Sequence, residues 1–360
     1  MDLVNQLISL LPLSYPFELV GVEKSEEKQE VHIYLQVSQG YLPSQDHTIH
    51  SYYNRSWEHL KLFQYRSFLH CRLPIYRHKK TGGFSKTSLD FARDHSRFTL
   101  LYEKEVMRLM GIHYCMSSVA TQLGIAVQRV EKIYHYYSAH LEALPVTEVA
   151  TQVGFDETST RKGHDYITTF VNMETATIIA IEDGKAASAV EKFFHNHPNP
   201  QAVRQLSMDM SPAFVSGAKR FFPQASITFD KWHVIKLLYK HLDELADKAD
   251  HFKAYIAGLM QDLTAFFQAN DAHKGKAQLC FIADFAQDCL GKNPISTTIE
   301  RHFDGIVNYF DTHLTNGVLE GINSKIQTLK RIARGFRYKE NFKKMIRFAF
   351  HKNQLSSKIT

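Results

Sequence analysis

Paired cysteines are missing from this chain. Its four cysteines, Cys71, Cys115, Cys280 and Cys289, are widely spaced and form no C-x-x-C pair. This spacing argues against a disulfide scaffold and against a self-contained zinc finger. Zinc is therefore not an expected cofactor.

Long hydrophobic runs are missing as well. There is no stretch of about 18 uncharged apolar residues. The apolar start, LVNQLISLLPL, lacks a basic leader and is interrupted by polar residues. With 360 residues, 44% apolar and 22% charged, the chain has the composition of an ordinary globular protein and the length of roughly two to three domains. We expect a cytoplasmic protein that does not bind membranes.

Acidic residues are scarce in the last forty residues. Residues 321–360 contain eleven Lys or Arg against one acid, Glu340, which gives a net charge of +10, whereas the whole chain carries only +6. This concentration predicts a polyanionic partner more strongly than the whole-chain charge does. A merely solvated basic tail is the alternative.

The most informative stretch covers residues 203–233. An apolar run ends at Asp209, a segment that favours a helix begins at Pro212, and a second apolar run ends at Phe229, just before Asp230. Strand, helix and strand in about thirty residues is typical of a parallel βαβ crossover, a unit that carries its chemistry at the C-terminal ends of the strands. Asp209 is predicted at such an end, on the more polar face; alternatively, it caps the following helix.

The N-terminal part gives weaker signals. Residues 31–37 alternate like a strand, whereas residues 51–65 are aromatic and polar with no clear period. Between residues 66 and 104 basic and aromatic residues mix, which suits contact with a phosphate backbone. One cysteine and three scattered histidines in this stretch are interpreted as incidental rather than as a metal site (His70, Cys71, His78 and His95).

Residues 116–135, MSSVATQLGIAVQRVEKIYH, have the spacing of a helix-turn-helix. The small Ala120 lets two helices approach, Gly124 takes the turn, and Val130 anchors the second helix on the first. Any small helical hairpin is the alternative. The second helix would expose three side chains to DNA: Gln128, Arg129 and Lys132. A short break at Leu144, Pro145 and Val146 is interpreted as the domain boundary.

From residue 153 the pattern changes to period two. Three short β-rich runs, 153–158, 165–171 and 177–181, predict an antiparallel meander, and residues 186–195 predict a helix. Together with the βαβ unit, this is the element order of an RNase H-like core. Residues 234–309 have helical spacing and predict a helical insertion.

A last amphipathic helix is predicted over residues 316–334. Ile322, Ile326 and Leu329 form its apolar stripe, while Glu320 heads a polar face that becomes basic toward the C-terminal end. A solvated surface helix is the alternative. The DNA contacts predicted in and after this helix are Lys325, Arg331, Arg334 and Arg337.

Asp156 lies within the first predicted strand, on the phase opposite to Phe155. In an RNase H-like core this strand is central and pairs with the fourth, so Asp156 and Asp209 become neighbours, and the last helix can bring Glu320 beside them. Three converging carboxylates repel strongly unless divalent cations neutralise them, which predicts two Mg²⁺ or Mn²⁺ ions that act on a phosphodiester. Neighbouring acids are the rival ligands: Glu157, Glu182, Asp183 and Asp230.

Three segments resemble the catalytic blocks of bacterial DDE insertion-sequence transposases of the ISL-three group. They read FDETSTRKGHDYITTFVNMET, LSMDMSPAFVSGAKRFFPQASITFDKWHVIKLL and LTNGVLEGINSKIQTLKRIARGFR. The resemblance implies Asp156, Asp209 and Glu320 as a metal-binding triad, with Asp230 and His233 as an accompanying D-x-x-H motif. It also implies a zinc-binding module and a helix-turn-helix in the N-terminal part, but the cysteine pairs of such a module are absent.

We therefore expect an α/β protein: an RNase H-like mixed sheet with a helical insertion, preceded by a helical DNA-binding region. The expected domains are an N-terminal basic and aromatic region, with a degenerate zinc-binding module as the alternative (1–98), a helix-turn-helix (99–145), the first part of the core (150–239), the insertion (240–310), and the final catalytic helix with its basic tail (311–347).

The expected function is a DDE transposase. It would recognise terminal inverted repeats, cut the ends of its element by metal-assisted hydrolysis, and join the 3′-hydroxyl to target DNA as a homo-oligomer. The alternatives are a catalytically inactive or repurposed transposase-derived DNA-binding protein and a structure-selective nuclease.

Overall fold

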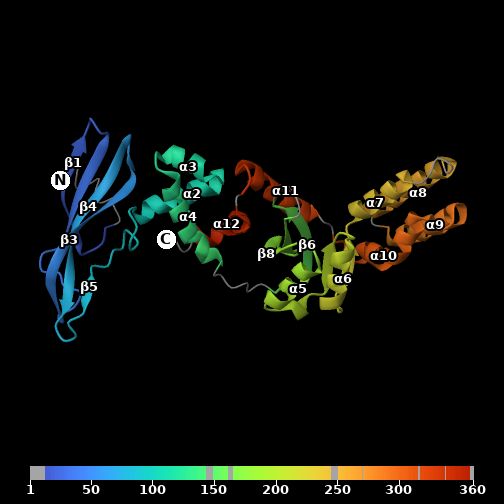
Figure 1. Ribbon diagram of the computed structural model, residues 1–360, viewed down its shortest axis with the longest axis horizontal. Coiled ribbons are helices and arrows are strands. Elements are labelled where there is room, and N and C mark those ends of the chain that lie inside the picture. Colours follow the sequence, from blue (N-terminus) through green and yellow to red (C-terminus); the bar gives the residue numbers. More distant parts are fainter. Residues whose placement is uncertain are drawn as a thin grey trace. The chain divides into compact units, whose positions relative to one another are not determined.

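Two five-stranded sheets, one in each of two compact units, organise the chain in this computed structural model (Figure 1). One unit contains residues 1–140 and 352–360, and the other contains residues 141–351. The structure describes residues 13–142, 149–160, 165–244, 250–269, 271–314, 317–336 and 338–356. The predicted break at Leu144, Pro145 and Val146 and the predicted DNA contact Arg337 lie outside the described residues.

The N-terminal sheet has the strand order β1-β2-β4-β3, and β5 also pairs with β4. Its strands are β1 (Phe17–Ser25), β2 (Glu30–Val37), β3 (His47–Leu62), β4 (Tyr65–His78) and β5 (Phe84–Lys86). The predicted alternation of residues 31–37 is confirmed in β2, where Val31, Ile33 and Leu35 are buried and the residues between them are more exposed. These side chains pack with Trp57, Leu69 and Leu73 in the core of the sheet.

Most of the stretch without a clear period, residues 51–65, is part of β3. The register between β3 and β4 shifts between Ile49 and Ser51 and again between His59 and Leu62. The second shift lies within residues 51–65 and exchanges the two faces of the strand, so no single period of two runs through the stretch.

The cysteine and histidine residues of β4 lie on different faces of the sheet. Cys71 is buried in the core. The adjacent His70 lies on the opposite face, where its ring hydrogen-bonds His32 at 2.9 Å and Ser56 at 2.8 Å. Consecutive strand residues point to opposite faces, so Cys71 and His70 do not share a metal ion.

Among the described residues, three helices directly follow this sheet in the sequence, and the last two form the predicted helix-turn-helix. The three helices are α2 (Leu100–His113), α3 (Met116–Leu123) and α4 (Val127–Glu142). Ala120 and Val130 are buried, and Gly124 ends α3 with a φ of +70°, a conformation that favours glycine. The spacing prediction is confirmed at all three positions.

The second sheet has the order β10-β9-β6-β7-β8. Its strands are β6 (Gln152–Ser159), β7 (Tyr166–Asn172), β8 (Thr177–Asp183), β9 (Gln205–Met208) and β10 (Ser226–Phe229). β6, β7 and β8 form the antiparallel meander, β9 is parallel to β6, and β10 is parallel to β9. The first strand is thus central and pairs with the fourth, which confirms the expected RNase H-like mixed sheet.

Helices cover both faces of this sheet. On one face, α5 (Ala187–Asn196) and α6 (Pro212–Phe221) pack against Phe155 and Phe170, and the rings of Phe155 and Phe214 lie 5.2 Å apart. On the other face, α11 (Gly317–Ile332) crosses β6, and α12 (Lys339–Ser356) follows it (Figure 1). The short helix η1 (Pro200–Ala202) leads into β9.

In the described part of residues 230–316, four helices lie between β10 and α11. They are α7 (Lys231–Asp243), α8 (Asp250–Ala269), α9 (Ala272–Leu290) and α10 (Pro294–Thr312). Their apolar faces join the core of the sheet; Gly305 of α10, for example, leaves no room for a side chain beside Phe229. Within the described ranges, no helix is both long and apolar enough to cross a membrane.

Candidate active site

Asp156 and Asp209 lie on neighbouring parallel strands. Gln152 pairs with Gln205 and Gly154 pairs with Ser207. The same register, carried two residues further, sets Asp156 beside Asp209, on the same face of strands that are about 5 Å apart. The predicted neighbourhood of these two carboxylates therefore follows from the strand pairing.

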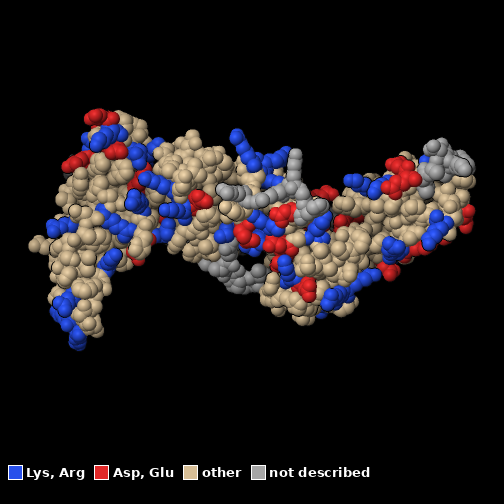
Figure 2. Space-filling model, in the orientation of Figure 1, with Lys and Arg blue, Asp and Glu red and all other residues tan. Residues whose placement is uncertain are grey.

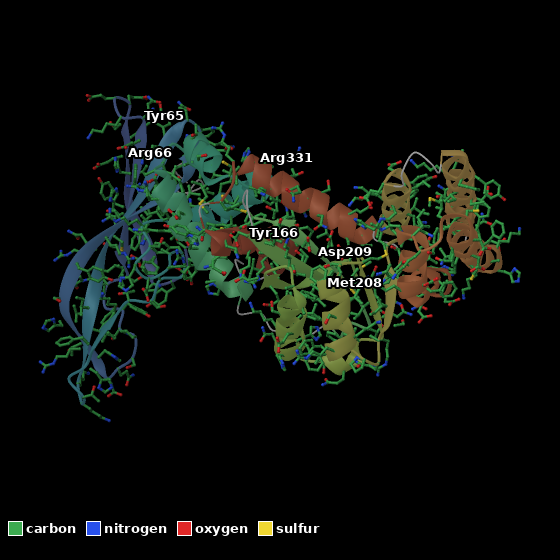
Figure 3. All side chains as sticks on the ribbon, turned by 45° about the vertical axis from the view of Figure 1, so that its right-hand side comes forward. Tyr65, Arg66, Tyr166, Met208, Asp209 and Arg331 are labelled. Atoms are coloured by element: carbon green, nitrogen blue, oxygen red, sulfur yellow. The ribbon has the colours of Figure 1, made fainter. Side chains whose placement is uncertain are left out.

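Asp209 directly follows β9 and does not cap the helix after it. Ser211 occupies the N-cap of α6, and Asp209 Oδ1 accepts a hydrogen bond from the Ser211 backbone N–H at 2.9 Å. Figure 3 shows Asp209 toward the first turn of α11, with Arg331 at the other end of that helix. The alternative interpretation of Asp209 as a helix cap is wrong.

Asp156 faces α11 and is largely shielded from water. Its Oδ1 accepts the Glu157 backbone N–H at 2.7 Å, and its Oδ2 accepts Asn323 Nδ2 at 2.6 Å. Burial raises the pKa of Asp156, and the charge of Asp209 raises it further, against the hydrogen bonds from Glu157 and Asn323 and the nearby His233. A carboxyl group with a raised pKa beside a second carboxyl group is typical of a functional site.

The pKa of Glu157, the nearest alternative metal ligand, is also affected by Asp156 and Asp209. Burial is the largest cause that raises this pKa, and the charges of Asp209 and Asp156 raise it further, whereas Lys185 lowers it. The other rivals on β8 lie two strands from β6. Asp183 forms ion pairs with Lys339 and Lys343, and Glu182 accepts a hydrogen bond from Asn196.

Helix α11 runs along β6 and carries Glu320. Leu319 lies against Gly154, Asn323 binds Asp156, and Lys330 Nζ donates to the Ser159 carbonyl at 2.7 Å. Residues 154–159 of the strand and residues 319–330 of the helix each span about 16 Å. The helix can therefore contact the strand along this whole length.

Glu320 is exposed one helical turn before Asn323. Residues three apart share a helix face, so Glu320 lies on the face that Asn323 presents to Asp156. Among the described residues, no three His, Cys, Asp or Glu side chains are close enough together to hold one metal ion. The structure brings the two aspartates together, whereas Glu320 lies on the neighbouring helix, outside such a cluster.

Asp230 and His233 follow β10, which pairs with β9 on the side away from β6. Asp230 caps α7: its Oδ1 accepts the His233 backbone N–H at 2.9 Å and lies 3.2 Å from His233 Nδ1. Burial opposes ionisation of Asp230, but hydrogen bonds from His233 outweigh it and lower the pKa of Asp230. The hydrogen bond to Asp230 raises the pKa of His233 against burial, and the charges of Asp156 and Asp209 add to the rise.

The predicted DNA contacts have different surroundings. Gln128, Arg129 and Lys132 are exposed on α4, but Arg129 Nη1 also lies 3.6 Å from the buried Glu58. Lys325 is an exposed residue, but its Nζ donates to the Ala349 carbonyl at 3.2 Å and lies 4.2 Å from the Phe350 ring centroid. Arg331 and Arg334 are exposed near the end of α11, where Figure 2 shows Lys and Arg side chains at the surface.

Two basic side chains of the C-terminal stretch serve the fold. Lys339 pairs with Asp165 and Asp183, and Lys343 lies 3.4 Å from Asp183 and 2.7 Å from Glu340. Charge counting did not reveal the pairs with Asp165 and Asp183, because these two acids are remote in sequence. The sequence analysis also missed Asn323 as a hydrogen-bond donor to Asp156. The only sequence signal for it was its place on the polar face of the helix predicted over residues 316–334.

The donor set fits a hard divalent cation. Mg²⁺ and Mn²⁺ prefer oxygen ligands, and Asp156 and Asp209 present carboxylate oxygens on one face of the sheet. A cation between them would relieve the repulsion that raises the pKa of Asp156.

Comparisons with known proteins agree with this arrangement. Residues 153–254 and 248–346 match a DDE-type transposase family, ISL3, and residues 87–138 match the helix-turn-helix domain of transposase family ISL3. The transposase for insertion sequence element IS1001 of Bordetella parapertussis is 23% identical over 248 residues. That match covers 56% of this chain and 61% of the relative's length. The catalytic and DNA-binding matches follow one another in a single chain, which therefore belongs to transposase family ISL3, the ISL-three group of DDE transposases.

Proposed function

We propose that this chain cuts and joins DNA at the ends of an insertion sequence. A water molecule would attack the phosphodiester at the element end, releasing a 3′-hydroxyl. That hydroxyl would then attack a phosphodiester of target DNA, displacing one 3′-oxygen and forming one new ester. The observation that carries this proposal is the parallel pairing of β6 with β9, whose register leads to Asp156 and Asp209, together with the hydrogen bond from Asn323 of α11 to Asp156.

Asp156, Asp209 and Glu320 are the proposed metal ligands. Two divalent cations held there would supply Lewis-acid stabilisation of the charge that develops on the reacting phosphate oxygens. The chain itself orients the ligands: the Ser211 N–H fixes Asp209, and Asn323 together with the Glu157 N–H fixes Asp156. Glu320, at the surface of α11, completes the set.

Asp230 and His233 are proposed as accessory residues. Asp230 holds the His233 ring and favours its protonated form. A protonated imidazole beside two carboxylates can donate a hydrogen bond to a phosphate oxygen of the bound strand. His233 therefore orients the phosphodiester without taking part in bond making.

The helix-turn-helix is proposed to recognise the terminal inverted repeats. Gln128 and Lys132 are exposed on α4, the second helix of the motif. Arg331 and Arg334 are proposed to hold the DNA strand at the end of α11, with a homo-oligomer bringing two element ends together.

The test is strand transfer on a labelled element end with Mg²⁺ or Mn²⁺. Asp209→Asn and Glu320→Gln should each lower strand transfer at least a hundredfold while DNA binding persists. Asp262→Asn, at an exposed acid of α8, is the control and should retain activity. Wild-type activity in both variants would refute the proposal. Hydrolysis without a joined product would identify a nuclease, and binding without cleavage by the wild type would identify a DNA-binding protein.

A further inference from the structure

Two adjoining hollows lie in the N-terminal unit, between the sheet and the helices. One has a volume of about 1180 Å³ and is lined by residues of β3, β5, the segment before α2, and Tyr136 of α4. The other, of about 600 Å³, reaches Arg129 of α4. Arg55, Lys86 and His95 line both hollows, which are therefore parts of one surface.

Positive charge dominates this surface. Among the described residues, the lining cations Arg55, Lys86 and Arg97 form no ion pair with a carboxylate. The lining acids are two. Glu58 is buried and already paired with Arg66 and Arg129, whereas Asp94 is exposed.

Two of these cations are held in place by neutral partners. Arg55 Nη2 donates to the Ser96 carbonyl at 3.0 Å, and its guanidinium lies 5.2 Å from the Trp57 ring centroid. Lys86 Nζ lies 5.6 Å from the Tyr53 ring centroid. The aromatic rings orient the cations without neutralising them.

The surface is continuous with the helix-turn-helix. The Glu58 N–H donates to the Arg97 carbonyl at 2.8 Å, and the Thr99 N–H donates to the Glu58 carbonyl at 3.1 Å, so the segment before α2 is attached to β3. Arg129, beside the exposed Gln128 of α4, forms the common border.

We infer that Arg55, Lys86 and Arg97 bind the phosphate backbone of the DNA duplex next to the segment that α4 contacts. This inference rests on one part of the proposed function, the binding of DNA, and does not require that the chain cleaves or joins DNA. Phosphate contacts position a protein on DNA and carry no sequence information, so they would strengthen binding to every sequence alike. The sheet thereby supplies a second set of contacts beside the recognition helix.

The test measures DNA binding by the full chain, with fluorescence anisotropy between about 50 and 200 mM salt. In Lys86→Ala/Arg97→Ala, binding to an element end and to a scrambled duplex should both weaken about tenfold. The slope of log K against log salt should fall by about 2, since each lost phosphate contact removes about 0.9. Both side chains are exposed, so the fold is retained, which thermal unfolding verifies.

The matched control is Lys28→Ala/Lys61→Ala, which removes the same charge from exposed positions outside both hollows, in the β1–β2 turn and in β3 of the same unit. It should bind with the wild-type slope. An unchanged slope in Lys86→Ala/Arg97→Ala, or an equal fall in the control, would overturn the inference. Because this readout is binding alone, an inactive wild type would refute only the catalytic proposal, and an active wild type with an unchanged slope in the variant would refute only this one.

Discussion

Asn323 Nδ2 donates a hydrogen bond to Asp156 Oδ2 at 2.6 Å and thereby joins helix α11 to β6, the central strand of the second sheet. Thr158 Oγ1 lies 3.4 Å from the amide oxygen of the same Asn323 side chain. The amide is thus held from both sides of its head group. Any movement of α11, which carries Glu320, is transmitted to Asp156 through this contact.

Substituting Asn323→Ala should lower strand transfer about tenfold, because the loss of one hydrogen bond to a charged group costs about 1.5 kcal/mol or more. The Asn323 bond lowers the pKa of Asp156. Without it this pKa rises, so the acidic limb of the pH–rate profile should move to higher pH. The measurement is initial rate against pH.

Gln327→Ala serves as the comparison for that experiment. Gln327 is exposed on α11, one turn beyond Asn323. Its substitution should leave the rate and the profile at their wild-type values. A profile that stays in place in Asn323→Ala would show that the hydrogen bond has no role in tuning Asp156.

Gly154→Ala should push α11 away from β6. The added methyl carbon would overlap Met173 Sδ and lie 2.9 Å from Leu319 Cδ1. Overpacking of this kind costs about 1–3 kcal/mol, and strand transfer should fall with stability. Gly321→Ala, in α11 itself with open space around the site, should instead stabilise the protein by about 0.5–1 kcal/mol. Thermal unfolding of the two variants distinguishes these outcomes.

The pair Asp230 and His233 should make stability depend on pH. The pKa of His233 is raised in the folded protein, chiefly by its hydrogen bond to Asp230. The stabilisation is therefore complete below the unfolded pKa of histidine and is lost as pH rises through the higher folded pKa. His233→Ala should be destabilised more at pH 5.5 than at pH 8.5 in metal-free buffer. Unfolding free energies that differ from wild type by the same amount at both pH values would contradict this.

The basic residues of the C-terminal stretch should divide into two kinds. Lys343→Ala removes an ion pair with Asp183 and should lower Tm by about 2–4 °C, equivalent to about 1 kcal/mol, with DNA affinity unchanged. Arg331→Ala, at an exposed position, should leave Tm unchanged and reduce the salt slope of binding by about 1. Equal effects of the two substitutions on DNA binding would argue against the division.

The second sheet was predictable because its strands keep a period of two and its turns carry clear signals. The predicted runs 153–158, 165–171 and 177–181 correspond to β6, β7 and β8 within one or two residues. The βαβ unit was equally clear. The order of elements then defined the strand order, and with it the meeting of Asp156 and Asp209.

The N-terminal sheet was not predictable as a whole, because its longest strand, β3, changes register twice. Side-chain pairing across long sequence separations was also hidden. Arg129 has the position of a DNA contact in the helix-turn-helix pattern. Its guanidinium nevertheless lies beside the buried Glu58 of strand β3, about seventy residues earlier in the sequence. Patterns within one segment report which face a residue occupies, but not what the neighbouring segment places there.

The hydrogen bond between the Ser211 N–H and Asp209 Oδ1 bears on how the proposed cation site would capture its ion. It restrains rotation of the carboxylate about its side-chain bond while the site holds no cation. The entropy of ordering this ligand is thus lost during folding rather than at the moment of metal uptake. Affinity for the ion should consequently depend on the backbone turn at residues 209–211 as well as on the charge of the aspartate.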